Sequence, residues 1–200
     1  PVVASVAQAK KMERSGADAV VCEGCEAGGH IGEQTTMALT PQIVDALSIP
    51  VVAAGGIGDG RGMAAAFMLG AEAVQIGTRF LVAEECTVHP NYKEKILNAK
   101  DIDTVVTGRI AGHPVRSIKN RMTRDYVKLE KEIGDAMELE KITVGSLRKA
   151  VVEGDTTMGS LMSGQSAGLI KKEQSCKEIV DEIMAEVQEV MKSRIGILGK

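Results

Sequence analysis

Over the first 76 residues, short apolar runs alternate with segments of helical spacing, and this alternation limits the fold more than any other feature. The apolar runs cover residues 2–6, 19–22, 51–54 and 73–76, and helical spacing follows at 7–15, 41–48 and 60–69. The runs lack the period-two alternation of half-exposed strands. They are typical of parallel strands buried on both faces and connected by helices. The pattern predicts an α/β fold, either four units of an eight-stranded barrel or an open doubly wound sheet.

The stretch after the second run contains a candidate active site. It reads Glu23-Gly-Cys-Glu-Ala-Gly-Gly-His30. Gly28 and Gly29 carry no side chain and leave room for a flat ligand beside the histidine. His30 is the one group of this segment that can donate or accept a proton near neutral pH. From these residues alone His30 is either a catalytic group or a hydrogen-bonded loop histidine, and the loop histidine is the more common case.

Two later strands end in small residues. Gly55 and Gly56 follow the third run, and Gly77 and Thr78 follow the fourth. In barrels the last two strand-to-helix loops commonly bind a phosphate through freed backbone amides. A tight turn without a ligand is the alternative. A dinucleotide fold would need Gly-x-Gly-x-x-Gly, whereas Gly56-x-Gly58-x-Gly60 has a different spacing, so the barrel is favoured.

Composition restricts the partners and the compartment. The net charge is −3 and aromatic residues make up 2% of the chain, so we expect an aliphatic core and no nucleic-acid partner. No apolar run is long enough to span a membrane, and we expect no membrane partner. The four cysteines do not suggest a disulfide framework, which favours the cytoplasm. Cys22 and Cys25 form an isolated C-x-x-C that closes a strand, so neither a metal site nor a redox site is expected.

The motifs together resemble a known family. The run from Glu23 to Gly32, Ala53-Ala-Gly-Gly-Ile57 and Gln75-Ile-Gly-Thr-Arg79 are similar to those of the nitronate monooxygenase family of flavin enzymes. The similarity is greatest to its flavin-dependent enoyl-acyl-carrier-protein reductases. It continues through residues 89–95, 115–120 and 164–168, and so covers nearly the whole chain.

The resemblance implies an FMN-binding (β/α)8 TIM barrel with a small second domain, in which NADH or NADPH reduces FMN and FMN reduces a 2-enoyl thioester. It implies that His30 is the catalytic residue. The FMN phosphate would lie on Gly55, Gly56, Gly77 and Thr78. The remaining cofactor-binding residues would be Glu23, Ala27, Gly28, Gly29, Gln75, Gly164 and Gln165. Monooxygenase relatives usually carry Gln in place of Glu23, which favours the reductase.

The resemblance also implies a division of the chain. Relatives begin with four further strand–helix units, so we expect the C-terminal half of the barrel here, with Pro1 in the fifth strand. Residues 1–85 would form strands five to eight, residues 86–150 a small inserted or lid domain, and residues 151–200 the return to the barrel and a C-terminal helix. The apolar spacing from 175 to 191 predicts that helix, with Ser175 as its N-cap.

Several residues keep two interpretations. Glu26 would cap a turn or orient His30, His89-Pro90 would begin a helix, and His113-Pro114 would form a turn. Seven basic residues would either form a solvated face or receive an acidic partner, namely Lys93, Lys95, Arg109, Arg116, Lys119, Arg121 and Arg124.

The expected partner is an acyl carrier protein bearing an enoyl chain, and the expected assembly is a homodimer. Two other functions stay open. A nitronate monooxygenase would use His30 as a base and oxygen as the oxidant. A non-catalytic barrel module would hold some other phosphorylated ligand on Gly55, Gly56, Gly77 and Thr78.

Overall fold

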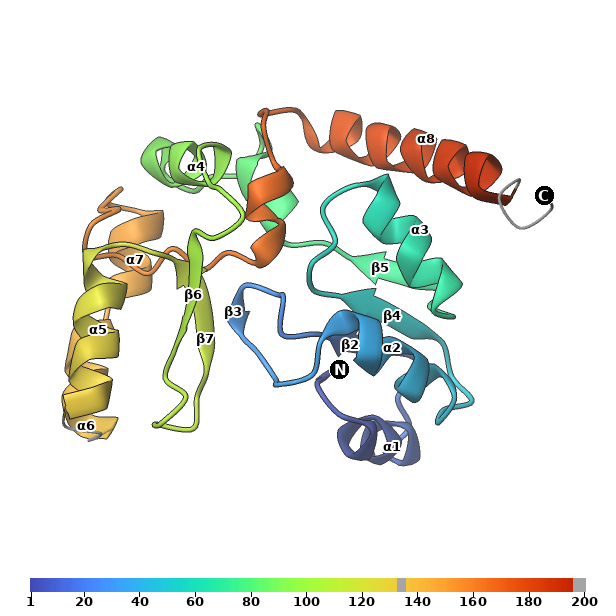
Figure 1. Ribbon diagram of the computed structural model, residues 1–200, viewed down its shortest axis with the longest axis horizontal. Helices are drawn as coiled ribbons and strands as arrows, with labels where there is room; N and C mark the ends of the chain where they lie inside the picture. Colours follow the sequence, from blue (N-terminus) through green and yellow to red (C-terminus); the bar gives the residue numbers. More distant parts are fainter. Residues whose placement is uncertain (133–135, 196–200) are drawn as a thin grey trace. The chain divides into compact units, whose positions relative to one another are not determined.

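The computed structural model describes residues 1–132 and 136–195 (Figure 1). By its internal contacts the chain divides into two compact units. The first contains Pro1–Glu26, Gly32–Ile76 and Gln174–Lys200, and the second contains Ala27–Ile31 and Gly77–Glu173. The three domains expected at 1–85, 86–150 and 151–200 stay a prediction, because contacts alone do not define segments that fold independently.

The first unit is built on a four-stranded parallel sheet. Its strands are β1 (Val2–Val3), β2 (Val20–Glu23), β4 (Val51–Ala54) and β5 (Ala73–Gln75), in the order β1-β2-β4-β5. Each strand therefore lies beside the next parallel strand along the chain. No reversal of strand order occurs within this sheet, as it would at the switch point of a doubly wound fold. The predicted α/β class with parallel strands is confirmed.

The first helices start at residues that differ from the predicted ones. The strand predicted over 2–6 ends at Val3, because Ser5 caps helix α1 (Val6–Arg14) and its hydroxyl accepts a 3.3 Å hydrogen bond from the Gln8 amide. The helix predicted over 41–48 is α2 (Thr36–Val44). Pro41 lies inside it, although a proline usually marks the first turn. Helix α2 starts earlier than predicted because the Glu26 carboxylate accepts hydrogen bonds from the amide of Thr36, its first residue.

The other two helices of this unit pack on each other. Helix α3 (Gly60–Met68) begins after Asp59, whose carboxylate accepts a 3.0 Å hydrogen bond from the Gly62 amide, and α8 (Cys176–Ile195) lies beside it in Figure 1. Ser175 caps α8 as predicted. Its hydroxyl accepts from the Glu178 amide at 3.2 Å, and the Glu178 carboxylate accepts from the Ser175 amide at 2.8 Å, which completes a capping box.

The core of the first unit is aliphatic, as expected. Val20, Leu39, Ile43 and Val51 are among its fully buried members. The Cys22 thiol lies in this core, 3.5 Å from the Thr40 hydroxyl, and burial raises its pKa. Cys22 is therefore a neutral packing residue.

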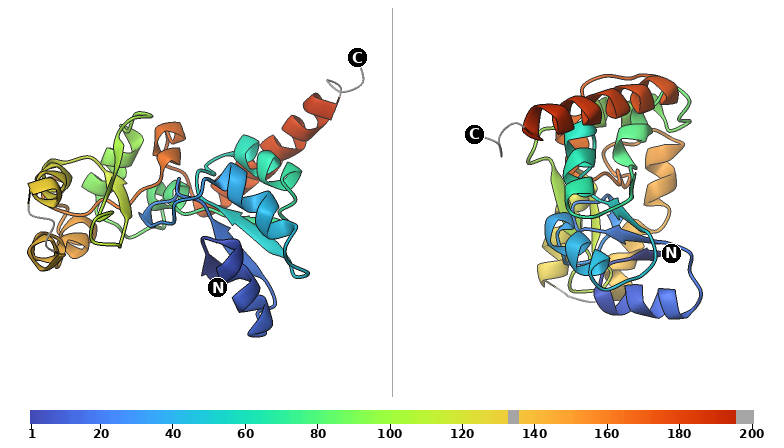
Figure 2. Two further views of the ribbon diagram at one scale, coloured as in Figure 1. Left: turned by 60° about the horizontal axis from the view of Figure 1, so that its bottom comes forward. Right: turned by 90° about the vertical axis from the view of Figure 1, so that its right-hand side faces the viewer.

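The second unit carries an antiparallel sheet in the order β3-β7-β6. Figure 2 shows α5 beside the β6–β7 hairpin. The elements of this unit are β3 (Gly29–His30), η1 (Thr78–Val82), α4 (Pro90–Leu97), β6 (Thr104–Thr107), β7 (Val115–Ile118), α5 (Arg121–Glu132), α6 (Ala136–Thr143), α7 (Ser146–Val151) and η2 (Gln165–Leu169).

The prediction for the first of two histidine–proline pairs is confirmed in this unit, while the second pair follows a turn at 109–112 and does not form it. The His89 side chain caps α4 and accepts a 3.1 Å hydrogen bond from the Asn91 amide. His113 and Pro114 lie in the connection between β6 and β7. The core of this unit contains Tyr92, Ile96 and Leu161. Within 1–132 and 136–195, no helix is both long and apolar enough to cross a lipid bilayer.

Candidate active site

The backbone of His30 is held by strand pairing in the second unit. Strand β3 pairs with β7 so that Gly29 lies opposite Arg116 and His30 opposite Val115, and the Ile31 amide donates a 3.1 Å hydrogen bond to the Pro114 carbonyl. Gly29 has a φ of +81°, a conformation that residues with a side chain rarely adopt. The glycine before His30 is therefore needed to bring the chain onto β7.

The same edge of β7 continues with Met162. An isolated antiparallel bridge places Met162 opposite Ser117, and the Ile118 amide donates to the Leu161 carbonyl at 2.9 Å. Residues directly opposite each other in antiparallel strands point to one face of the sheet. His30 and Met162 thus share a face with Val115 and Ser117.

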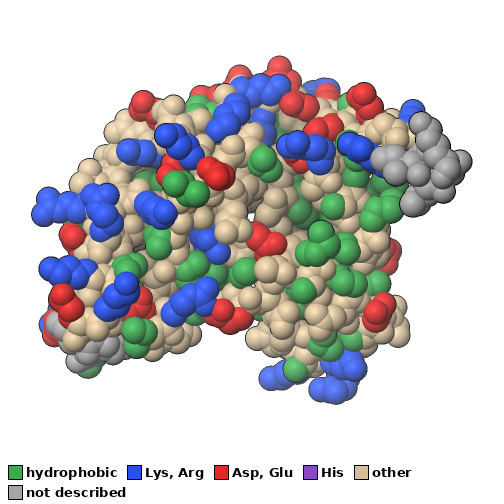
Figure 3. Space-filling view, viewed as in Figure 1, with side chains coloured by type: hydrophobic (Ala, Val, Ile, Leu, Met, Phe, Trp, Pro, Cys, Tyr) green, Lys and Arg blue, Asp and Glu red, His purple; other side chains and the backbone are tan. Residues whose placement is uncertain are grey.

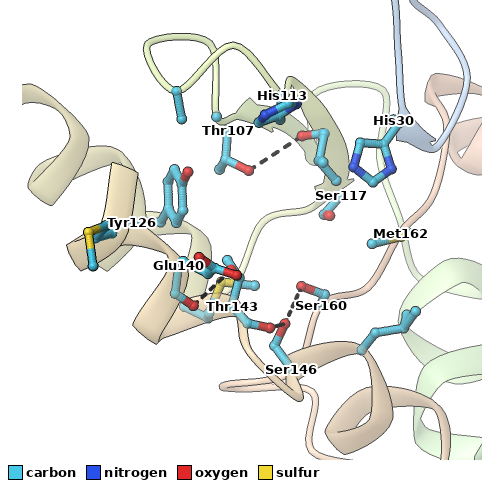
Figure 4. A pocket seen from close by; sticks show the side chains of 16 residues that line it. His30, Thr107, His113, Ser117, Tyr126, Glu140, Thr143, Ser146, Ser160 and Met162 are labelled. Atoms are coloured by element: carbon cyan, nitrogen blue, oxygen red, sulfur yellow. Dashed lines mark hydrogen bonds between the residues drawn. The ribbon is translucent and has the colours of Figure 1, made fainter. Parts of the chain in front are cut away.

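That face forms one wall of a cavity of about 520 Å³ (Figure 4). His30, Ser117 and His113 come from the sheet side, and Tyr126, Glu140 and Ser146 come from the helices. The lining combines hydroxyl and thioether groups. The hydroxyls belong to Thr107, Ser117, Tyr126, Thr143, Ser146 and Ser160, and the thioethers to Met122, Met137 and Met162.

The hydroxyls nearest the helices are ordered by one another and by the backbone. The Ser146 and Ser160 oxygens lie 2.8 Å apart, and Ser146 donates to the Thr143 carbonyl at 2.6 Å. Burial, and then the nearby Glu130 carboxylate, raise the pKa of Tyr126. Tyr126 therefore presents a neutral hydroxyl to the cavity. The cavity can bind a ligand that has both polar and apolar parts.

A close backbone approach lies next to His30 in the chain. A Cβ on Gly28 would come within 2.6 Å of the Ser163 carbonyl carbon and 2.7 Å of the Gly164 nitrogen, so no side chain fits there. The Gly164 amide donates a 2.9 Å hydrogen bond to the Thr78 hydroxyl. The structure thus brings Gly28, Thr78 and Gly164 together.

The other predicted cofactor-binding residues of this unit are neighbours in the sequence of Gly28, Thr78 and Gly164. Ala27 is buried and precedes Gly28, while Gln165 is exposed at the first residue of η2. Gly77 precedes η1, and a Cβ placed on it would meet no heavy atom within 4 Å. The Gly77 backbone therefore has open space beside it.

In the first unit, three strand ends align. Glu23 pairs with Ala54, and Ala54 pairs with Gln75, so the last residues of β2, β4 and β5 form one row at the carboxyl edge of the sheet. Burial raises the pKa of Glu23. A half-buried carboxyl group with a raised pKa in such a row is a candidate hydrogen-bonding group for a ligand.

The strand end after β4 is bare backbone. Gly55 and Gly56 have φ values of +95° and +75°, two consecutive left-handed residues that favour glycine. A Cβ on Gly55 would also lie 2.7 Å from the Gly24 carbonyl oxygen. The pair is therefore required by the turn itself, and its role toward a ligand stays a prediction.

Glu26 has a structural role that settles its two interpretations. Its carboxylate accepts hydrogen bonds from the Thr36 amide at 2.9 and 3.1 Å and from the Thr36 hydroxyl at 3.1 Å. The Thr36 hydroxyl also lies 2.9 Å from the Gly55 carbonyl oxygen. Glu26 therefore caps α2 from ten residues upstream and ties its first turn to the end of β4.

The residues present fit FMN, the cofactor that the resemblance implies. The Ser163 hydroxyl is fully buried, and the Tyr92 side chain lies within hydrogen-bonding reach of it. Thr78 is 8% exposed, and its hydroxyl accepts from Gly164, which leaves its own hydrogen to be donated. A hydroxyl donor at Thr78 and the open space beside the Gly77 backbone suit a phosphate. Beside Gly28, the space that a side chain would take is filled by the backbone of Ser163 and Gly164.

Two of the expected surface cations are not on the surface. Lys93 is buried, and its ammonium group donates to the Ala83 carbonyl and to the Glu173 carboxylate, both at 2.6 Å. Arg116 is also buried and donates to the Thr104 hydroxyl at 3.0 Å. Their assignment to a solvated or partner-binding face was wrong. A buried charged group needs hydrogen-bond partners, and here residues distant in the sequence supply the acceptors.

Sequence reasoning missed the hydroxyl lining and Ser163. Single serines and threonines have no spacing signature. The β7 segment did contain a signal for Ser117. In a strand, Val115 and Ser117 are two residues apart and must share a face, while Arg116 points to the other face. Ser163 directly precedes Gly164 and Gln165, which were predicted to bind the cofactor, so its position in the sequence could have suggested it as a further candidate.

Known proteins resemble the chain over most of its length. The family described as nitronate monooxygenase matches residues 1–186. FabK from Thermotoga maritima superposes with a TM-score of 0.95 at 53% identity, over 98% of this chain and 63% of that chain. A nitroalkane oxidase from Streptomyces ansochromogenes superposes with a TM-score of 0.81 at 29% identity, over 96% of this chain and 58% of that one.

The curated relatives are named as nitronate monooxygenases and not as FabK. A probable nitronate monooxygenase from Staphylococcus saprophyticus is 38% identical over 198 residues, which is 94% of this chain and 56% of that protein. The chain thus spans about half to two thirds of the length of the proteins it matches. The expected fold class, the C-terminal half of this barrel family, is confirmed by these matches.

Proposed function

The chain belongs to the nitronate monooxygenase family, and from this premise we propose that it carries the His30 site of an FMN-dependent enoyl-acyl-carrier-protein reductase. The reaction would use NADH or NADPH to reduce the double bond of a trans-2-enoyl thioester. The substrate would arrive on an acyl carrier protein.

The cavity beside His30 is the observation that carries this proposal. Its volume of about 520 Å³ and its mixed hydroxyl and thioether walls suit a long, flexible thioester better than an alkyl nitronate of a few heavy atoms. Flexible methionines adapt to apolar chains of different shape. The match to FabK at 53% identity, higher than the 29% to the nitroalkane oxidase, favours the same assignment.

FMN, when bound, supplies the hydride chemistry. We propose that Gly55, Gly56, Gly77 and Thr78 hold its phosphate. Side chains and backbone near the ring would come from Glu23, Ala27, Gly28, Gly29, Gln75, Gly164 and Gln165. The buried Ser163 hydroxyl, which directly precedes Gly164, is an additional candidate.

His30 would serve the substrate. Reduction of an enoyl thioester adds a hydride to the β carbon and a proton to the α carbon, and negative charge builds on the carbonyl oxygen in between. An imidazole N–H directed at that oxygen stabilises the charge, and the same group can deliver the proton. His30 lies on the cavity wall, where a bound thioester would present its carbonyl group.

The second candidate is a nitronate monooxygenase, favoured by the name of the curated relatives. With a neutral nitroalkane, His30 would then act as the base that removes a proton from the carbon next to the nitro group, which gives the nitronate that is oxidised. Oxygen would be the oxidant, and no carrier protein would be needed.

An anaerobic experiment on the full-length protein separates the candidates. The flavin is reduced with NADH or NADPH, and its absorbance is followed after addition of crotonyl thioester. Prompt reoxidation is expected. The proposal is wrong if the thioester leaves the flavin reduced while nitronate and oxygen support turnover, and a protein that binds no FMN would point to the non-catalytic module.

Replacement of the histidine tests its role. His30→Ala should retain FMN and lose turnover by about 10²- to 10⁴-fold, the usual effect of a lost general acid. The matched control is His89→Asn, which changes a histidine outside the cavity and keeps a capping side chain on α4. Unchanged turnover of His30→Ala would end the catalytic assignment.

A further inference from the structure

The second unit has a basic groove on its surface, between β6 and α5. Its volume is about 370 Å³. Four cationic side chains line it, Lys119, Arg124, Lys128 and Lys131, and its apolar floor includes Val105 and Val127. Figure 3 shows Lys and Arg side chains gathered on this face over α5.

The helical repeat of α5 creates this stripe. Arg124, Lys128 and Lys131 are spaced four and three residues apart and lie on one face. The opposite face carries Met122 and Tyr126, which line the cavity beside His30. One helix therefore forms a wall of both the cavity and the groove, and a helix is about 10 Å across.

The positive charge is local. Residues 119–131 contain five basic and two acidic residues, a net charge of +3 in a chain of net charge −3. Arg121 pairs with Asp125 at 3.6 Å and Lys128 with Glu132 at 3.9 Å, both exposed pairs that contribute little. Arg124 and Lys131 form no ion pair within 1–132 and 136–195. Lys119 donates to the Ile102 carbonyl, so among the four groove cations Arg124 and Lys131 are the ones available to an anionic partner.

We propose that this groove docks an acidic helix of the acyl carrier protein that delivers the enoyl substrate. This inference rests on the proposed function. From Arg124 to Lys131 the cations extend over about 10 Å of helix, which is too long for one phosphate and matches successive turns of an acidic helix. The apolar floor receives the helix's apolar side chains. Docking there places the carrier across a single helix from the cavity.

Charge reversal tests the surface in the full-length enzyme. The variant carries Arg124→Glu, Lys128→Glu and Lys131→Glu together. Two substrates are compared, crotonyl-acyl-carrier protein and the uncharged crotonyl-N-acetylcysteamine thioester. For the carrier substrate kcat/KM should fall by at least about 10-fold, while the small thioester should change by less than about 2-fold, because steering acts only on the charged partner.

The control variant reverses three exposed cations of α1, Lys10→Glu, Lys11→Glu and Arg14→Glu, and should leave both substrates unaffected. Flavin content and melting temperature show whether each variant folds. A milder variant with Gln at 124, 128 and 131 should give an intermediate loss. Added salt should raise the wild-type KM for the carrier substrate more than that of the charge-reversed variant.

The outcomes separate the two proposals. Docking is refuted if the carrier substrate is unaffected, if both substrates fall equally, or if only the KM for NADH or NADPH rises, which would assign the groove to nucleotide phosphates. A wild-type enzyme that reduces neither thioester refutes the proposed function itself. Wild-type reduction of the small thioester alone refutes the carrier as partner.

Discussion

The Gly164 amide donates a 2.9 Å hydrogen bond to the Thr78 hydroxyl and joins segments that are 86 residues apart in the sequence. Both residues are buried. This contact holds the returning segment of the second unit against the start of η1. It also sets the orientation in which the Thr78 hydroxyl can donate its own hydrogen.

Thr78→Val should weaken both the fold and the binding of FMN. The variant leaves the buried Gly164 amide without an acceptor, which lowers the free energy of unfolding by about 1–3 kcal/mol. It also removes the hydroxyl donor from the proposed phosphate site. Thr78→Ser keeps the acceptor and should behave nearly as the wild type. Denaturant unfolding and FMN titration by fluorescence measure the two effects, and equal FMN affinity for all three proteins would contradict the phosphate assignment.

Glu26→Ala should destabilise the first unit by about 1–2 kcal/mol, because the carboxylate both caps the first turn of α2 and interacts with its dipole. Glu26→Gln keeps an acceptor and loses only the charge, so we expect a smaller loss. Glu72→Ala, at an exposed glutamate, is the matched control. Thermal unfolding of the three variants tests this order. A similar loss for Glu72→Ala would show that the cap is unimportant.

Glu23→Gln should change the pH dependence of stability. Burial raises the pKa of Glu23 above its ordinary value of 4.5. Between 4.5 and the raised pKa the native state binds more protons than the unfolded state, so the free energy of unfolding falls as pH rises through this window. The glutamine variant lacks this loss. Its stability relative to the wild type should therefore increase from pH 4 toward pH 7, and a pH-independent difference in urea unfolding would refute the expectation.

Two glycines of α3 should respond to alanine with opposite signs. A Cβ on Gly60 would lie 2.6 Å from the Glu186 Cβ and from the Val187 amide nitrogen, so Gly60→Ala forces α8 away and should cost about 1–3 kcal/mol. At Gly62 the nearest atoms, on Ile57, are 3.4 Å away. Gly62→Ala should therefore stabilise the helix by about 0.5–1 kcal/mol. Melting temperatures of the two variants should move in opposite directions, and a fall for both would show that Gly62 has less room than the geometry indicates.

The parallel sheet could be predicted because strands buried on both faces are apolar throughout. The run at 51–54 coincides with β4, β2 begins and ends one residue later than predicted, and β5 ends one residue earlier. Local capping at Ser175 and His89 was also predictable, since the capping side chain lies next to the helix that it caps.

Features set by distant residues were not predictable. The start of α2 depends on Glu26, ten residues upstream, and the burial of Lys93 depends on Glu173, 80 residues away. Strand β3 is two residues long and has no periodicity to detect. The motif around His30 indicated a site, but the cavity lining comes from β3, a hairpin, three helices and residues 160–162, and no single segment encodes how these meet.

The second unit takes only residues 27–31 from the early part of the chain, and His30 is among them. Every residue that lines the cavity beside His30 also belongs to this unit. His30 therefore belongs to the same unit as the cavity walls, while the parallel sheet is built from other residues. Substitutions between 104 and 162 can change which ligands the cavity accepts and leave the parallel sheet intact, so ligand preference can diverge in evolution independently of the sheet.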